Sequence, residues 1–258
     1  MRMKKTPGIP LFADDGGTGE PAILFIHGLG GNTSQWKAQL EHLRRKRRAL
    51  AVDLRGHGRT PLPGDGVFTI EAMADDLKAL ADRLHLRCFV LAGHSAGASV
   101  AIALAGRDPE GLAGLLLVDP AGDDRQVPRS EVESFMAALE ADYRSAIEDY
   151  WLELLNRSDR AVREKVIADL RATSREAVIG IFRGILTYDP VTPLRRYPGP
   201  VLSVITPLNN APFSLHRLIP DLPRTMITGT GHWPQMDRPE EINGIIDAFL
   251  DRVMRTPR

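Results

Sequence analysis

Six short apolar runs, each followed by turn residues, constrain the fold of this chain more than any other feature. The runs are Ala22–Ile26, Ala49–Val52, Cys88–Ala92, Leu115–Val118, Val201–Ile205 and Thr225–Thr228. Continuous apolar runs of this length indicate strands that are buried on both faces, as in a parallel sheet. Helical patterns separate the runs, for example over Ile70–Leu84. Strands that alternate with helices predict an α/β fold, in which helices flank a mostly parallel central sheet.

The strand pattern stops after the fourth run and resumes at the fifth, with helical patterns alone in between. Amphipathic stripes in this segment predict four short helices, the first of which begins with a capping box at Ser130 and Glu133. Because the strand pattern resumes afterwards, we interpret the segment as an insertion over the sheet rather than as a separate helical domain. We therefore predict a core domain of residues 1–121 and 199–258 and a helical cap of residues 122–198.

The charge balance of the chain limits its partners. The 258 residues include 33 Lys and Arg against 33 Asp and Glu, a formal net charge of zero. A balanced charge creates no global field, so neither nucleic acid nor an anionic membrane is expected as a partner. The one basic run, Arg44–Arg48, is typical of a solvated helix end. The apolar runs are too short to span a bilayer, so no membrane span is expected.

Cysteine content and the N-terminus predict the compartment. Cys88 is the only cysteine, so an intramolecular disulfide is impossible and a reducing compartment is the default. Its place at the start of an apolar run is typical of a small buried hydrophobic residue rather than of a catalytic thiol. The basic residues within Met1–Lys5 precede no apolar stretch, so the sequence predicts no secretory signal. Together these features predict a cytoplasmic protein.

The strongest chemical signal is the segment Gly93–Gly97, which has the pattern G-x-S-x-G between an apolar run and a helical pattern. A serine at a sharp strand-to-helix turn is held out of the sheet with its hydroxyl exposed. The flanking glycines leave room for the strained backbone, and the helix start places N–H groups beside the site. The pattern alone occurs by chance. In this context it predicts that Ser95 is a nucleophile rather than part of a structural turn.

A second glycine-rich turn, His27–Gly31, directly follows the first apolar run. Such a turn can present a backbone N–H group to the same site. We therefore predict an oxyanion hole formed by the N–H groups of Leu29 and Ala96. A phosphate-binding turn is the alternative, but the pattern G-x-G-x-x-G and the P-loop lysine are both absent.

The general base has to come from another part of the sequence, because a histidine adjacent to the nucleophile is poorly placed to reach its hydroxyl. Among seven histidines, His232 lies in a glycine-rich loop after the last predicted strand and before a final helical pattern. That loop should open at the same edge of the sheet as Ser95, so His232 is the predicted base; a histidine that only stabilises its loop is the alternative. His94 should point away from Ser95, and His27 and His57 are expected to orient loops.

Together these motifs resemble the α/β-hydrolase superfamily over nearly the whole chain. Besides the two glycine turns, Asp53–Gly58 matches its D-x-R-G-x-G segment, and Gly231-His232 followed by Pro239–Glu241 matches its histidine loop and closing helix. The resemblance implies an acyl-transfer hydrolase of the α/β-hydrolase fold with a helical lid, and it implies no cofactor and no metal. It also implies that Asp53 and Arg55 shape a loop.

The carboxylate of a Ser-His-acid triad is missing from the position that the resemblance implies. The superfamily usually places an aspartate shortly after the strand predicted at Val201–Ile205, but Asn209 stands there, and Thr206 replaces a glycine. An amide can accept a hydrogen bond from histidine, but it cannot stabilise an imidazolium electrostatically. The preceding strand ends at Asp119, a position similar to that of the acid in pancreatic-type lipases and some haloalkane dehalogenases.

We therefore predict that Asp119 completes the triad. The alternatives are Asp123, Asp124 or no acid at all, since many hydrolases carry Val-Asp-Pro at this position without using it.

The predicted reaction is two-step acyl transfer, in which Ser95 attacks a carbonyl and His232 takes its proton. The superfamily places an aspartate at the nucleophile position for dehalogenase and epoxide-hydrolase chemistry, so neither is expected here. The predicted substrates are small-to-medium, mostly apolar carboxylic esters or lactones. Trp36, Trp151 and Trp233 are candidate walls of the substrate pocket, although packing explains each of them equally well.

Two other functions fit the same motifs. A ligand receptor on the same scaffold would keep the triad and turn over slowly or not at all, and Asn209 favours this interpretation. A perhydrolase or a carbon–carbon bond hydrolase would share the triad and differ only in the pocket.

Overall fold

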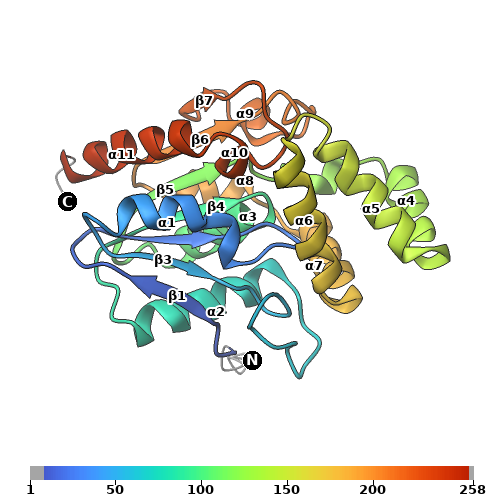
Figure 1. The fold of residues 1–258 in the computed structure, drawn as a ribbon, viewed down its shortest axis with the longest axis horizontal. Coiled ribbons are helices and arrows are strands. Elements are labelled where there is room, and N and C mark those ends of the chain that lie inside the picture. The colour runs from blue at the N-terminus through green and yellow to red at the C-terminus, as the bar shows by residue number, and fades with distance from the viewer. Residues whose placement is uncertain (1–8, 256–258) are drawn as a thin grey trace.

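Within residues 9–255, which the computed structural model describes, a seven-stranded sheet runs through the middle of the molecule (Figure 1). The strand order is β1-β3-β2-β4-β5-β6-β7. Every neighbouring pair is parallel except β1 and β3, which are antiparallel. The prediction of a mostly parallel α/β sheet is confirmed. Met1–Lys5, from which no secretory signal was expected, lie outside the described residues.

The apolar runs form the predicted strands. The strands are β1 (Ala13–Gly16), β2 (Ala22–Ile26), β3 (Ala49–Val52), β4 (Phe89–His94), β5 (Leu112–Val118), β6 (Val201–Ile205) and β7 (Arg224–Met226). The ends of β4, β5 and β7 differ from the predicted bounds. The apolar pattern does not reveal β1, because this edge strand has the sequence Ala-Asp-Asp-Gly and is only partly buried.

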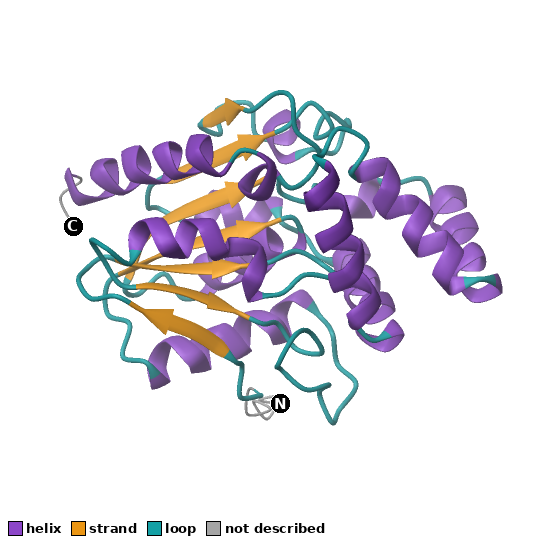
Figure 2. Cartoon of the chain, in the orientation of Figure 1, coloured by secondary structure: helices purple, strands orange, loops and turns teal. Residues whose placement is uncertain are grey.

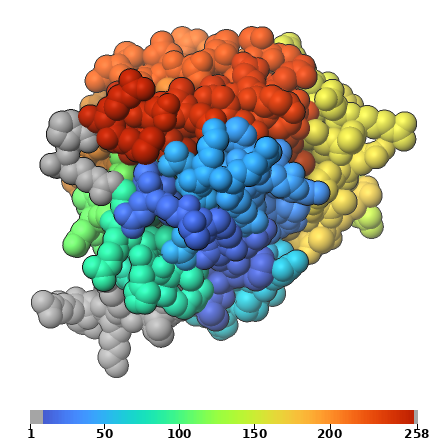
Figure 3. All heavy atoms as spheres, turned by 60° about the vertical axis from the view of Figure 1, so that its left-hand side comes forward, coloured from blue at the N-terminus to red at the C-terminus, as the bar shows by residue number. Residues whose placement is uncertain are grey.

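Helices cover both faces of the sheet (Figure 2). The core helices are α1 (Lys37–Leu43), α2 (Ile70–Arg83), α3 (Ala96–Arg107), α8 (Val191–Arg196) and α11 (Pro239–Arg255). Residues of α1 and α11 pack together on one face, and residues of α2, α3 and α8 pack on the other. Figure 3 shows α11, in red, lying beside the N-terminal elements on the first of these faces.

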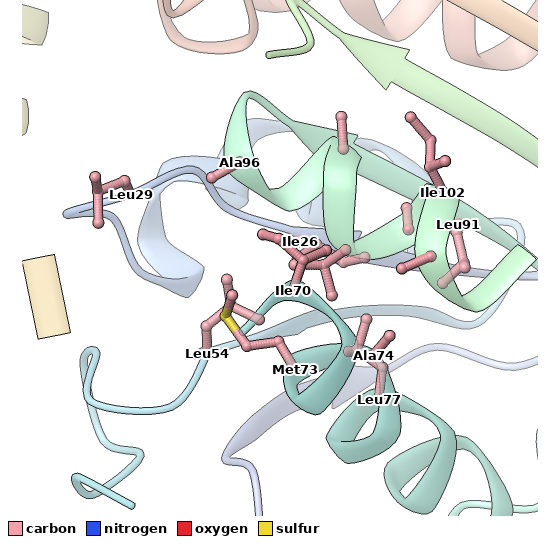
Figure 4. Packing of buried hydrophobic residues seen from close by; sticks show 14 of the residues in the cluster. Ile26, Leu29, Leu54, Ile70, Met73, Ala74, Leu77, Leu91, Ala96 and Ile102 are labelled. Carbon is pink, nitrogen blue, oxygen red and sulfur yellow. The ribbon is translucent and has the colours of Figure 1, made fainter. Parts of the chain in front are cut away.

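The two-residue period of β2 explains how the sheet joins the two halves of the core. Ile23 and Phe25 belong to the cluster under α1 and α11, whereas Leu24 and Ile26 belong to the cluster with α2 and α3. All four side chains are fully buried. Figure 4 shows Ile26 among the residues of the second cluster. Burial of such a side chain contributes about 1.5–3 kcal/mol, so a one-residue slip of β2 would exchange the two faces at high cost.

A helical insertion lies between β5 and β6, beyond the carboxyl ends of the strands (Figure 1). It contains α4 (Arg129–Ala141), α5 (Tyr143–Leu154), α6 (Arg160–Ala172) and α7 (Arg175–Thr187). The prediction of four inserted helices is confirmed within the described part of the chain. The capping box is wrong: α4 begins before Ser130, its N-cap is Pro128, and Glu133 pairs with Arg129.

The boundaries of the cap at residues 122 and 198 stay a prediction. Within this range α8 packs against α3 of the core: a Cβ on Gly106 would lie 2.3 Å from Cβ of Pro193. The remaining short elements are the 3₁₀ helices η1 (Thr33–Trp36) and η2 (Asp124–Gln126) and the α-helices α9 (Leu215–Leu218) and α10 (Pro234–Asp237). None of the helices within residues 9–255 has the length and apolar character needed to cross a membrane.

The strand order brings the loops that carry the predicted site residues to one edge of the sheet. The chain moves outward from β2 to β3 and then returns to β4 on the other side of β2, which makes a switch point at the carboxyl ends of β2 and β4. The register aligns His94 with Val118 and Val118 with Val204. The residues that follow β4 and β5 therefore start level with one another, and β6 continues one residue further, to Ile205.

Candidate active site

Ser95 lies at the turn between β4 and α3, with φ of 52° and ψ of −121°. A residue other than glycine rarely adopts this backbone conformation, which stores strain. The neighbouring glycines make the turn sterically allowed. A Cβ on Gly93 would lie 2.4 Å from the carbonyl oxygen of Gly97, and one on Gly97 would lie 2.5 Å from that of His27. The expected strand–turn–helix geometry is present, and Ser95 lines a cavity.

The imidazole of His232 is joined to the carboxylate of Asp119, since Nδ1 lies 2.6 Å from Oδ2. Asp119 is 1% exposed and follows β5 with a positive φ of 40°. Its backbone N–H donates to the carbonyl of Val204 on β6, at 2.7 Å. A buried carboxylate in this position can orient the ring and stabilise its protonated form. His232 lines the same cavity as Ser95. Within residues 9–255 no hydrogen bond joins the two side chains, and such a contact commonly tightens only with substrate present.

The residues at the usual acid position hold Asp119 in place. Thr206 donates its backbone N–H to Oδ1 at 2.8 Å and its hydroxyl to Oδ2 at 3.0 Å. The side-chain amide of Asn209 donates to the carbonyl of Pro120, at 2.8 Å. The loop after β6 therefore supports the loop after β5. The polar substitutions Thr206 and Asn209 are the sequence signal of this support, which sequence reasoning interpreted only as a missing acid.

Asp123 and Asp124 have other partners. Asp123 forms an ion pair with Arg125, whose Nε lies 2.7 Å from Oδ1, and also accepts from Gln126. The Arg125 guanidinium holds the pKa of Asp123 below its usual value. Asp124 lies in the wall of the cavity. Burial, together with the charge of Asp123, raises the pKa of Asp124 to about 7.

The loop that carries Leu29 is packed against the serine turn, because a Cβ on Gly28 would lie 3.0 Å from Cβ of Ser95. Figure 4 shows Leu29 on this loop and Ala96 at the start of α3. Within residues 9–255 the backbone N–H groups of Leu29 and Ala96 have no hydrogen-bond acceptor. Two free N–H groups next to a nucleophile are suited to bind an oxyanion.

Two buried histidines fix the Leu29 loop. His27 accepts from the N–H of Leu54 through Nε2, at 3.0 Å, and donates from Nδ1 to the carbonyl of Gly28, at 2.7 Å. His57 accepts from the N–H of Gly30 through Nε2, at 3.1 Å. Burial lowers the pKa of His27 to about 4 and that of His57 to about 3, so both rings stay neutral and keep one nitrogen as an acceptor. The prediction that they orient loops is confirmed.

His94 contacts the backbone of the histidine loop. Its Nε2 donates to the carbonyl of His232 at 2.7 Å, as expected of a residue that does not act as the base for Ser95. Burial keeps the pKa of His94 well below its usual value. The histidine loop is also bound to the cap: the backbone N–H of His232 donates to the carbonyl of Leu154 at the end of α5, at 3.0 Å. His232 is therefore held through its backbone by the core and by the cap.

Asp237 connects the same loop to the cap and is 7% exposed. Its Oδ2 accepts from the hydroxyl of Thr230 at 2.7 Å and from the N–H of Gly231 at 3.1 Å. The hydroxyl of Ser158, between α5 and α6, donates to the same oxygen at 2.8 Å, and the N–H of Asp159 donates to Oδ1 at 3.0 Å. The sequence assigns no role to Asp237, because nothing in it predicts partners in the cap.

A cavity of about 470 Å³ opens in front of Ser95 and His232. Trp151 of α5 and Trp233 next to the histidine line it. Most other walls are apolar side chains of the cap and of the loops beneath it, among them Val132, Phe135, Phe182, Ile185, Leu186 and Phe213.

Trp36 is not part of the cavity wall, which corrects the prediction that it contacts substrate. Its side chain is fully buried in the core cluster under α1 and α11. The indole is stacked on Phe25 of β2, with ring centroids 4.6 Å apart. Trp36 lies near the glycine turn in the sequence, but η1 directs its large apolar side chain into the core, where burial stabilises the fold.

The parallel sheet, the helical insertion and the serine at a strained strand–helix turn define an α/β-hydrolase fold. Residues 23–245 match the alpha/beta hydrolase family, and the chain belongs to that family. The mouse (Mus musculus) sn-1-specific diacylglycerol lipase ABHD11 is 30% identical over 261 residues, which cover 92% of this chain and 83% of the lipase.

Solved structures agree with this assignment. A thermophilic esterase from Thermogutta terrifontis superimposes with a TM-score of 0.80 at 29% identity, covering 94% of this chain and 93% of the esterase. The enol-lactonase from Burkholderia xenovorans LB400 has a TM-score of 0.80, with 93% of this chain and 96% of the lactonase covered. At 21% identity, the likeness to the lactonase shows the fold alone.

Proposed function

We propose that the protein is a serine hydrolase that cleaves carboxylic esters or lactones with Ser95, His232 and Asp119 as its catalytic triad. The observation that carries this proposal is the 2.6 Å contact between His232 and the buried Asp119, in a cavity that Ser95 also lines. The similar esterase, at 29% identity, and the similar lipase, at 30% identity, support ester hydrolysis as the reaction class.

In the proposed reaction, Nε2 of His232 takes the proton of Ser95 as Oγ attacks the substrate carbonyl. Asp119 holds the Nδ1–H of the ring and stabilises the imidazolium. The N–H groups of Leu29 and Ala96 donate to the oxyanion of the tetrahedral intermediate. His232 then protonates the leaving alcohol, deprotonates a water molecule that attacks the acyl-enzyme, and returns the proton to Ser95 as the acid leaves.

The cavity supports a substrate of small to medium size. Its volume of about 470 Å³ lies in the range of ligand pockets that enclose small molecules, and its walls are mostly apolar. Trp151 and Trp233 are proposed as substrate-binding walls, and a small-molecule ester or lactone is the proposed partner. The proposed reaction needs no cofactor. We keep a cytoplasmic location as a proposal, since the single Cys88 suits a reducing compartment.

Two other proposals share the same site. A slow or non-hydrolytic receptor was suggested by Asn209, but Asp119 supplies a carboxylate to His232 from the neighbouring strand, which favours an enzyme. A perhydrolase or a carbon–carbon bond hydrolase would use the same three residues. Peracid formation from acetate and hydrogen peroxide that outpaces ester hydrolysis and needs Ser95 would favour the perhydrolase.

The direct test is hydrolysis of p-nitrophenyl acetate, butyrate and octanoate by the wild-type protein and by Ser95→Ala. Removal of the nucleophile should lower kcat by at least about three orders of magnitude. Ser99→Ala, the same substitution one turn along α3 and outside the cavity, is the matched control and should keep the wild-type rate. A wild-type protein no faster than Ser95→Ala on all three esters would refute the hydrolase.

A further inference from the structure

The charged residues in the wall of the cavity beside the proposed triad are all acidic. Among the described residues, neither lysine nor arginine lines it. Asp119 is occupied by His232 and Thr206. Glu131, at the start of α4, is exposed to solvent. Asp124, the first residue of η2, is thus the carboxyl group of the cavity wall that is neither bound to the base nor fully exposed at the rim.

Asp124 makes no ion pair within residues 9–255, although an arginine follows it in the sequence. Arg125 is bound to Asp123 at 2.7 Å and to Asp189 at 3.1 Å, so its guanidinium is directed away from Asp124. The hydrogen bond that Asp124 receives comes from the backbone of Gly122. A carboxyl group has room for several donors, so most of the hydrogen-bonding capacity of Asp124 is left for water or a ligand in the cavity.

The apolar surroundings of Asp124 make its unused hydrogen-bonding capacity important for binding. Val127, Phe135 and Phe182 line the same space and offer no hydrogen bonds. While the cavity is filled with water, the carboxyl group of Asp124 is hydrated. An apolar ester would displace this water. Within residues 9–255 only the backbone of Gly122 would then remain bound to the carboxyl group, so most of its hydrogen-bonding capacity would be buried and unused.

A substrate hydroxyl group removes this cost whatever the protonation state of Asp124. The pKa of about 7, raised by burial and by Asp123, means that neutral and ionised forms coexist near neutral pH. A hydroxyl donates to the ionised carboxylate and also accepts from the neutral acid. A substrate carboxylate would be repelled by the ionised form, and no lysine or arginine of residues 9–255 lines the cavity to attract it.

We propose that Asp124 is a specificity-determining residue that selects neutral esters carrying a free hydroxyl group over purely apolar esters and over esters carrying a carboxylate. This inference rests on the proposed esterase function, and it concerns the part of the substrate that does not react.

The test compares kcat/KM within two sets of substrates, one varied in the acyl chain and one in the alcohol. The acyl set is the p-nitrophenyl esters of hexanoate, 6-hydroxyhexanoate and adipate, and the alcohol set is propyl butyrate against glycerol monobutyrate. In the wild-type protein the hydroxylated ester of at least one set should be preferred about tenfold over its apolar partner. The adipate ester should be the poorest of its set.

Asp124→Leu should abolish the preference for the hydroxyl while keeping hydrolysis of the hexanoate ester. Asp124→Asn, which can still donate and accept, should keep the hydroxyl preference and gain activity on the adipate ester. Glu133→Leu, an exposed position on α4 outside the cavity, is the matched control and should leave all ratios unchanged.

The outcomes separate this inference from the function on which it rests. If no ester is hydrolysed by the wild-type protein in a Ser95-dependent manner, the proposed function fails. If the wild-type protein hydrolyses the esters but shows no hydroxyl preference in either set, or if Asp124→Leu keeps the preference, the esterase stands and the role of Asp124 is refuted.

Discussion

Replacement of Asp119 by asparagine should lower kcat about ten-thousandfold, although the two side chains have nearly the same shape. The structure gives the reason, because the backbone N–H of Thr206 donates to Oδ1 and requires an acceptor there. The amide nitrogen of an asparagine must then take the place of Oδ2, which faces Nδ1 of His232 at 2.6 Å. The hydroxyl of Thr206 also lies against Oδ2, but it can rotate and accept instead.

An amide N–H directed at Nδ1 forces the ring proton onto Nε2, so His232 can no longer take the proton of Ser95. The same exchange in a serine protease reduces turnover by about four orders of magnitude for this reason. A factor of ten thousand corresponds to about 5.4 kcal/mol of transition-state stabilisation. The KM for the ester should change little, because the lost interaction belongs to the transition state.

The assay is steady-state hydrolysis of p-nitrophenyl butyrate by folded proteins whose thermal unfolding has been compared. Asn209→Ala removes the hydrogen bond to the carbonyl of Pro120 but no triad group, so its kcat should fall by about tenfold or less. Retention of more than about a tenth of kcat by Asp119→Asn would refute the assignment. A loss of activity in Asp123→Asn instead would indicate a different acid.

Two further predictions concern the frame around the site. Burial lowers the pKa of His27 to about 4 and that of His57 to about 3, so the unfolded chain, with values near 6.5, binds protons first as the pH falls. The stability that the neutral rings contribute is complete above about pH 6.5. Between pH 7.5 and pH 5 the free energy of unfolding should fall by about 2 kcal/mol for each ring. Urea titrations at both pH values should show that His57→Gln loses less than the wild type; an equal loss would contradict the reasoning. Asp237→Ala leaves four donors without their acceptor and should lower the free energy of unfolding by about 3–5 kcal/mol. Both variants at Asp237 and at the exposed Asp251 can be compared by thermal unfolding. Asp251→Ala should change the free energy of unfolding by less than about 0.5 kcal/mol, and equal effects of the two substitutions would contradict the role of Asp237.

The parts of the fold that the sequence predicts are those in which burial controls the residue pattern. A strand covered on both faces, such as β2, must be apolar throughout, so its pattern is visible in the sequence. An edge strand such as β1 is held by backbone hydrogen bonds to one neighbour and can have almost any composition. Ser130 is not the N-cap of α4. A helix can begin at any of several neighbouring residues, and this one begins directly after Pro128.

Candidate site residues were predictable where a local motif carries the constraint. The turn at Ser95 needs glycines at fixed positions, and such a pattern is visible without a structure. The support of Asp119 by Thr206 joins residues 87 positions apart, and no periodicity reports such a contact. Trp36 was predicted at the pocket wall and lies in the core instead. Closeness to the glycine turn in the sequence does not determine on which side of the sheet a side chain lies.

The bonds from the histidine loop to the cap divide the insertion into an exchangeable part and a fixed part. The end of α5 and the turn before α6 are joined to the histidine loop by Leu154 and Ser158, which bind His232 and Asp237. In α4 the only buried residue is Leu139. Chimeras that take α4 from a relative should therefore inherit a new substrate range with intact chemistry. Crossover points placed between α5 and α6 should yield proteins that fold but no longer hold His232 in the position seen here.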